Sequence, residues 1–154
     1  MAYYSRPEEV LKRFREIFTA RGESLGIKYI AIQDENLRPE YPALEISAGP
    51  LLRDIQTTHK FGVIFEMSFW IYHANFESTH ASRTIEDMEL ATNIVRFLHQ
   101  PGIRTLEDDS DPGPNKNKII FGYVVQETPG VIARAIVATR LVWRGQSEVS
   151  FNDS

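Results

Sequence analysis

Residues 61–74, FGVIFEMSFWIYHA, are apolar at every odd position from 61 to 71. Because successive side chains of a strand point to opposite faces, this period of two predicts one long strand from about Thr58 to Ala74 with a fully apolar face. At about 3.3 Å per residue such a strand extends roughly 50 Å, whereas most strands have about five or six residues. We therefore expect it to reach beyond the rest of its domain or to bend at Gly62.

A second long strand is predicted near the C-terminus. Residues 131–144, VIARAIVATRLVWR, alternate in the same way. The apolar run at 119–125 predicts a shorter strand, and the sequence ETPG at 127–130 is typical of a turn. Together these segments predict a long C-terminal hairpin, followed by a polar tail after residue 145.

Two helices are predicted, one before and one after the first long strand. The sequence Ser5-Arg6-Pro7-Glu8 has the pattern of a capping box, which places the N-cap of the first helix at Ser5, and the helical spacing ends at Gly22 and Gly26. The second helix is predicted to begin after Ser82 and to end before Pro101. Its apolar stripe is so wide that we expect more than one side to be covered; it comprises Ile85, Met88, Ala91, Val95 and Leu98, with Leu90, Ile94 and Phe97 beside them.

The predicted order is therefore a helix, strands at 27–32, 41–48 and 58–74, a second helix and the C-terminal hairpin. Short connections between successive strands favour antiparallel pairing. The sequence thus predicts a single α+β domain over residues 1–154, with a mainly antiparallel sheet of long strands packed against two helices. The segment at about 105–118, rich in proline, glycine and asparagine, predicts an exposed, flexible loop.

The composition excludes several classes of protein. The 154 residues include no cysteine, which excludes disulfides and cysteine-bound metal sites. The formal net charge of −4 weighs against a dedicated nucleic-acid-binding protein. The first residues lack the order of a signal peptide, and no window approaches the roughly 20 apolar residues that cross a membrane. We therefore expect a cytoplasm-like environment and no membrane partner.

No catalytic motif appears in the sequence. The four histidines, at positions 59, 73, 80 and 99, form neither an HxH nor an HExxH pair. The sequence DDSDPG at 108–113 has the oxygen-rich composition of a calcium loop, but no glutamate stands at its twelfth position, which favours a solvated loop. We therefore predict no enzyme activity, no cofactor and no metal. The alternative is a small-ligand pocket around Glu66, Tyr72 and His73.

Both long strands carry large apolar side chains on the face opposite the predicted core. Trp70 and Tyr72 lie on this face of the first strand, and Ile132, Ile136 and Val142 on that of the second. A sheet with one solvated face should instead alternate cleanly to polar residues. Two interpretations remain open: a helix covers each side of the sheet, or another chain covers the second face.

Three arginines, Arg134, Arg140 and Arg144, share the parity of this second face on the last strand and form a basic stripe. The stripe can be a solvated surface, can form salt links to neighbouring subunits, or can face DNA. The residues predicted to lie at a subunit interface or in a lumen are Trp70, Tyr72, Arg134, Ile136, Arg140, Val142 and Arg144.

These elements resemble the tail terminator proteins of tailed bacteriophages, also called tail completion or neck proteins. The resemblance lies in YPALEI at 41–46, in FGVIFEMSFWIYHANF at 61–76 leading into IEDMELATNIVRFLHQ at 85–100, and in GVIARAIVATRLVWRG at 130–145. The resemblance covers most of the chain and lies in the order of the elements and in their hydrophobic pattern. The family has no catalytic residues that could be carried over to this sequence.

In that family six copies form a ring that caps the tail tube, stops its growth and offers a docking surface to the head or connector. The resemblance implies a virion protein of the tail or neck, present in the host cytoplasm before assembly. Its implied partners are its own copies in a hexameric ring, the tail tube protein, the head–tail connector or neck proteins, and DNA passing through the lumen. It also implies that the long strands supply the subunit contacts and that the loop at 105–118 lies on an end face or rim. The nearest alternative is another head–tail joining or tube-related neck subunit.

Overall fold

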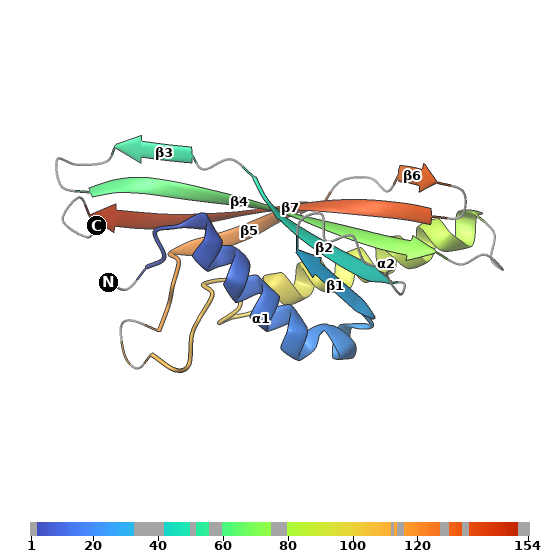
Figure 1. Cartoon of the computed structure of the whole chain (residues 1–154), viewed down its shortest axis with the longest axis horizontal. Helices are drawn as coiled ribbons and strands as arrows, with labels where there is room; N and C mark the ends of the chain where they lie inside the picture. The colour runs from blue at the N-terminus through green and yellow to red at the C-terminus, as the bar shows by residue number, and fades with distance from the viewer. Residues whose placement is uncertain are drawn as a thin grey trace.

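The computed structural model describes residues 3–32, 42–49, 52–55, 60–74, 80–111, 113, 116–126, 130–133 and 136–150. Within these ranges the chain forms two helices and a mainly antiparallel sheet, which confirms the predicted α+β class (Figure 1). The elements are α1 (Pro7–Leu25), β1 (Tyr29–Ile32), β2 (Ala43–Ala48), β3 (Leu52–Ile55), β4 (Lys60–Ala74), α2 (His80–Leu98), β5 (Phe121–Gln126), β6 (Gly130–Ala133) and β7 (Ile136–Ser150).

The sheet is organised around the pair β4 and β7. Its main path runs β1-β2-β4-β7-β5, while β3 pairs with β4 and β6 pairs with β7. β1 and β2 pair in parallel, and the other described pairs are antiparallel. β3 was not predicted, because its four residues, LRDI, are too few for a periodic pattern.

The β4–β7 pair has an unbroken register from Lys60↔Ser150 to Ala74↔Ile136. The register therefore contains no bulge at Gly62. The prediction of a polar tail after residue 145 is wrong up to Ser150, because these residues are the pairing partners of the first residues of β4. Backbone groups of β4 would otherwise lack hydrogen-bond partners. The buried Ser147 adds a side-chain bond, donating its hydroxyl to the carbonyl oxygen of Tyr4 at 2.6 Å.

The structure does not confirm the long C-terminal hairpin. The predicted strand over 131–144 is replaced by the short β6 and the long β7, which pair antiparallel with an irregular register between Val131 and Ala133. β5 pairs with the part of β7 further along the chain, from Phe121↔Gln146 to Gln126↔Leu141. The C-terminal region therefore uses three strands, because β7 is long enough to take both β5 and β6 along one edge.

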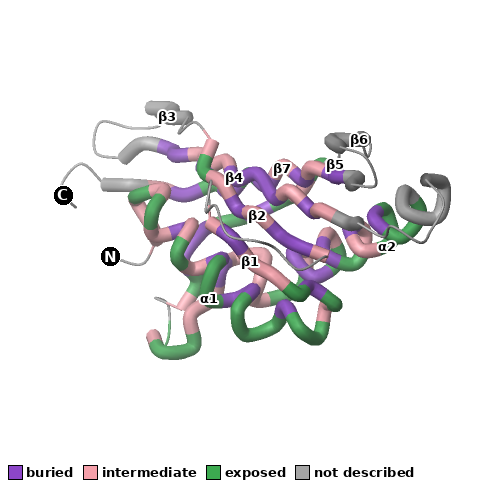
Figure 2. The backbone as a smooth tube through the Cα atoms, turned by 45° about the vertical axis from the view of Figure 1, so that its right-hand side comes forward, coloured by how far each residue is buried: buried purple, intermediate pink, exposed green. Residues whose placement is uncertain are grey.

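Both helices pack against the same face of the sheet, which carries the odd-numbered side chains of β4 (Figure 1). Phe14 of α1 meets Phe69 and Trp143 edge-on, with ring centroids 5.0 and 4.7 Å apart. Phe18 of α1 contacts Phe97 of α2, with ring centroids 5.5 Å apart. The predicted apolar face of β4 is thus part of the buried core (Figure 2), with Val63, Phe65, Met67, Phe69 and Ile71 at most 1% exposed.

The first helix begins one residue later than predicted. Arg6, and not Ser5, is the N-cap. The carboxylate that reaches back belongs to Glu9 and not to Glu8: its Oε1 accepts a hydrogen bond from the backbone N–H of Arg6 at 3.1 Å. Only the residue at the third helical position can make this contact, and with Arg6 as the cap that residue is Glu9.

The second helix begins at His80, two residues before its predicted N-cap at Ser82. Its buried side is also rotated away from the predicted stripe. Ile85 and Met88, predicted to face inward, are 56% and 44% exposed. The residues that α2 buries are Asp87, Ala91, Ile94, Phe97 and Leu98.

A buried acid explains this rotation. Asp87 is 0% exposed, and its carboxylate accepts a hydrogen bond from the hydroxyl of Thr139 on β7. A donor to a buried carboxylate offsets part of the cost of removing it from water, so the contact favours the orientation in which this side of α2 faces the sheet. Hydrophobicity alone points to a different side of the helix.

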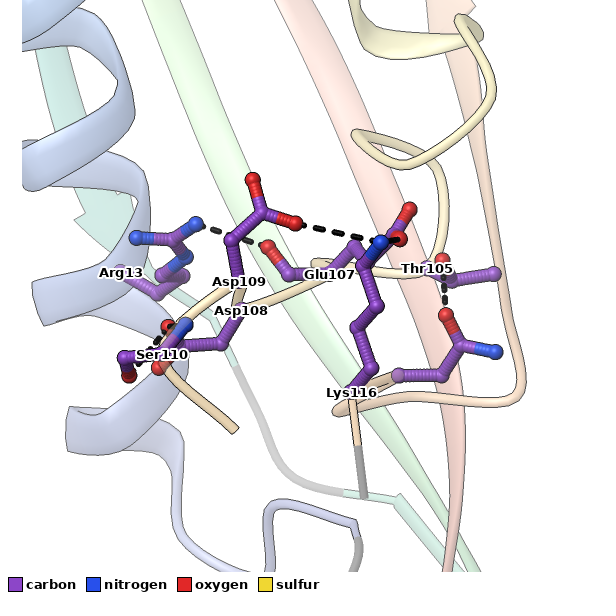
Figure 3. Close-up of polar contacts among 8 residues, drawn as sticks. Arg13, Thr105, Glu107, Asp108, Asp109, Ser110 and Lys116 are labelled. Carbon is purple, nitrogen blue, oxygen red and sulfur yellow. Dashed lines mark hydrogen bonds and ion pairs between the residues drawn. The ribbon is translucent and has the colours of Figure 1, made fainter. Parts of the chain in front are cut away.

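The segment predicted to be a flexible loop, about 105–118, is held against α1 where the structure describes it (Figure 3). Arg13 of α1 donates from Nη2 to the carbonyl oxygen of Glu107 at 2.7 Å. Lys116 forms ion pairs with Glu107 and with Asp109. The side chain of Leu106 is 0% exposed. The described residues of the segment form a loop, as predicted, and Asp109, Ser110 and Asn117 are exposed. Ion pairs within the segment and the buried Leu106 fasten this loop to the rest of the domain.

Candidate assembly surfaces

No helix that the structure describes lies over the second face of the sheet, opposite α1 and α2 (Figure 1). We call this the uncovered face. The register places the even-numbered side chains of β4 and β7 on it, and cross-strand pairing adds the odd-numbered side chains of β5. Five of the residues predicted to form an interface lie on this face: Trp70, Tyr72, Arg140, Val142 and Arg144.

Trp70 lies at the centre of a half-buried aromatic cluster on the uncovered face. Its ring stacks on that of Tyr72, with centroids 6.4 Å apart and an interplanar angle of 18°. The guanidinium carbon of Arg140 lies 5.7 Å from the Trp70 centroid, within reach of a cation–π attraction. Arg140 also donates to the hydroxyl of Ser68 from Nε at 3.2 Å and from Nη2 at 3.1 Å. The rings of Trp70 and Tyr72 are thus nearly parallel, and contacts within one chain already hold Trp70 and Arg140 in place.

Arg144 lies opposite Glu66 in the β4–β7 register, and its Nη2 is 3.8 Å from Glu66 Oε1. The guanidinium is thus accompanied by an acid. Arg140, two positions away along the same face with Val142 between them, is held by Ser68 and Trp70. The two arginines therefore do not form the simple basic stripe that the sequence predicts. Arg134 lies outside the described residues, as does the side chain of Ile136.

Among the sheet side chains that the structure describes, the most exposed apolar ones belong to β5. Phe121, Tyr123 and Val125 are 39%, 40% and 55% exposed, and Arg104 places its guanidinium carbon 4.1 Å from the Phe121 ring centroid. In register they lie beside Gln146, Arg144 and Val142 of β7. This strand was predicted from the sequence, but its exposed row was not. The alternation of large side chains in FGYVV, at 121–125, indicates that row.

The outer edge of β5 is partly occupied by side chains of the same chain. Arg104 donates from Nε to the carbonyl oxygen of Gly122 at 3.3 Å, and the Val124 N–H donates to Nε2 of His99 at 3.3 Å. Because Nε2 of His99 accepts, Nδ1 carries the proton and donates to the carbonyl oxygen of Val95 at 2.9 Å. These two bonds occupy backbone groups on the outer edge of β5 that could otherwise pair with a strand of another chain.

A second exposed apolar surface lies on the outer side of α2. Ile85 and Met88 border a shallow groove of about 540 Å³, whose other described lining residues are Glu89, Thr92, Asn93 and Arg96. The sequence predicted an apolar stripe wide enough to be covered on more than one side. Within the described part of the chain, Ile85 and Met88 are left uncovered.

The described residues bring together no cluster of side chains suited to metal binding. None of them form a group of three or more His, Asp or Glu side chains that could hold a metal ion. In the segment resembling a calcium loop, Asp108 accepts from Ser110 and Asp111 pairs with Lys118. Glu66 and Tyr72 are six residues apart on β4, about 20 Å along the strand, so they do not converge on one small ligand. The side chain of His73 lies outside the described residues.

The sequence matches no protein-family model, and no curated protein is significantly similar to it. Among the described residues, no helix combines the length and the apolar character needed to span a membrane.

Proposed function

We propose that this chain is a structural subunit that assembles with its own copies into a ring, and that the ring caps the tail tube of a bacteriophage as a tail terminator. The observation that carries the proposal is the uncovered face. Both helices lie on one side of a sheet built on two strands of 15 residues, and large side chains crowd the other side. A monomer rarely leaves such a surface bare unless a partner covers it.

The exposed aromatic row supports an assembly surface and argues against a solvated sheet. Phe121 and Tyr123 present large rings that lose little conformational freedom when they are covered, as is typical of interface residues. Trp70 and Arg140, of types enriched at the centres of interfaces, lie on the same face and are already ordered. The cost of ordering them on association is therefore small.

The arginines favour protein contacts over DNA. Arg144 is paired with Glu66, and Arg140 is held by Ser68 and Trp70. A surface that binds DNA through phosphates needs clustered cations without nearby acids. We therefore place this face at a contact between subunits or with the tail tube.

The experiment is deletion of the gene in the phage that carries it, followed by electron microscopy of the lysate. Loss of a tail terminator leaves tails of irregular length alongside separate, DNA-filled heads. Complementation with the wild-type chain restores uniform tails, and Tyr123→Asp does not. The matched control is Lys12→Asp, which changes an exposed residue on α1, far from the uncovered face, and restores them.

Tails of uniform length in the deletion lysate contradict the proposal. If such tails accumulate unattached to heads, and the purified chain binds the portal side and not the tube end, the chain is a head–tail joining subunit instead.

A further inference from the structure

The largest exposed apolar side chains on the described elements gather at two separate places. One group, the helix patch, consists of Ile85, Met88, Glu89 and Thr92 on α2, around the groove described above. The other, the strand patch, consists of Phe121, Tyr123, Val125 and Arg144 on the uncovered face of β5 and β7.

The two patches lie on opposite sides of the sheet. α2 contacts β4, β5 and β7 on the core side, where Asp87 bonds to Thr139. Ile85 and Glu89 lie roughly half a turn of the helix wheel away from Asp87, so they face away from the sheet. The strand patch also faces away from the helices, but on the other side of the sheet. One copy therefore cannot present both patches to a single partner.

The patches complement each other in shape and charge. The helix patch is a groove that includes a flexible methionine, and the strand patch presents aromatic rings that such a groove can accept. Glu89 forms no ion pair with any residue in the described ranges, while Arg144 leaves 44% of its side chain exposed beside Glu66. Arg96, the cation of the groove, is seven residues beyond Glu89, about 10 Å along the helix. When Glu89 of one copy contacts Arg144 of the next, Arg144 therefore stays well away from Arg96 of the first copy.

We propose that the helix patch of one copy binds the strand patch of the next, in a head-to-tail contact in which Glu89 pairs with Arg144. The contact itself is inferred from the two patches. That the row of copies joined by this contact closes into a ring rests on the proposed function. A contact between two unlike surfaces repeats from copy to copy and ends only when the ring closes. A symmetric dimer would instead use one patch twice.

A mixing experiment tests this contact. Met88→Asp disables the helix patch and Tyr123→Asp the strand patch; both side chains are exposed, and circular dichroism checks that each variant is folded. Each variant alone remains a single chain in mass measurements at micromolar concentration, where the wild-type chain forms a larger species. Mixed in equal amounts, the two variants give a species of twice the mass of one chain and no larger one, because one intact contact remains.

A charge exchange tests the pairing of Glu89 with Arg144. Glu89→Arg and Arg144→Glu each weaken assembly, and the chain that carries both changes recovers most of it. The control Lys12→Asp assembles like the wild-type chain.

The proposal is overturned if the mixed patch variants stay single chains, if either patch variant alone assembles like the wild-type chain, or if the double exchange restores nothing. A chain that passes these tests but leaves tail length unaffected keeps this contact and refutes the tail-terminator function. A chain that sets tail length but fails the mixing test refutes only the contact.

Discussion

Gly122 of β5 lies directly opposite Gly145 of β7, and the indole of Trp143 fills the space that the two glycines leave. A Cβ on Gly145 would lie 2.1 Å from Cη2 of Trp143, and one on Gly122 would lie 2.7 Å from its Nε1. Trp143 is 0% exposed and meets Phe14 of α1 edge-on. The two glycines thus allow a large ring to lie flat on the sheet beneath the first helix.

Gly145→Ala should lower the free energy of unfolding by about 1–3 kcal/mol, the range observed when a packed core is overfilled. Alanine is usually the better strand residue by up to about 1 kcal/mol, but here its methyl group overlaps a rigid ring that cannot move aside cheaply. Urea unfolding followed by circular dichroism measures the change. Gln146→Ala, on the exposed side of the same strand, is the control and should have little effect. Equal stability of Gly145→Ala and the wild-type chain would contradict this packing.

The hydrogen bond between Thr139 and Asp87 should stabilise the docking of α2 on the sheet. Thr139→Val keeps the volume of the side chain but removes a donor to a buried carboxylate, at a cost of about 1–3 kcal/mol. In a double-mutant cycle with Asp87→Asn the two changes should be coupled by about 0.5–3 kcal/mol. Thr92→Val, on the outer side of α2, serves as the control. Strictly additive effects would mean that the two residues do not act together.

Asp108 gives the loop at 105–118 a dependence on pH. The hydroxyl of Ser110, at 2.7 Å, and its backbone N–H, at 3.0 Å, donate to Oδ1 of Asp108 and lower the pKa of this carboxyl. Since the folded-state pKa is depressed, the resulting stabilisation is present above the pKa of the unfolded chain and is lost as the pH falls through the folded-state pKa.

Ser110→Ala should therefore raise the pKa of Asp108 toward its ordinary value, measured by NMR titration of the carboxyl carbon. The control is Ser24→Ala, which removes a hydroxyl bonded to Arg21 at the end of α1 and leaves the titration of Asp108 unchanged. An unchanged titration in Ser110→Ala would show that the two residues are not bonded in solution.

His99 should protect the edge of β5 through its bond from the Val124 N–H. His99→Leu removes the acceptor while keeping an apolar side chain, so the Val124 amide should exchange with solvent several-fold faster. The Ile120 N–H, which donates to the carbonyl oxygen of Gln146 at 2.8 Å, should keep its rate. Exchange rates measured by NMR decide the matter: a general increase would indicate loosening of the whole sheet, and no increase would exclude a bond from Val124.

Local patterns were sufficient to predict the two helices and the long strand β4. The alternation from Phe61 to Ile71 is a property of neighbouring residues, and from Val63 onward the strand turns it into one fully buried row and one mostly half-buried row. The end of α1 near Gly26 was equally local, because glycine readily adopts the left-handed conformation that it has there, with φ 86°. In the candidate site, the alternation of β4 placed Trp70 and Tyr72 on one face, and that of the last strand placed Arg140 on the same face. The alternation in FGYVV indicates a row on β5, but the face of the sheet on which this row lies depends on the pairing of β5 with β7, which joins residues about 20 positions apart.

The sequence by itself determined the class of the fold, the long strand β4 and the apolar row that became part of the core, because hydrophobic periodicity is a property of consecutive residues. Only the tertiary structure decided that both helices take the same side of the sheet, that Asp87 turns α2 so that Ile85 and Met88 face outward, and that the acidic loop is fastened to α1 through Arg13. Each of these depends on a hydrogen bond or a packing contact between residues far apart in the chain, and no local pattern records which distant partner a side chain will meet.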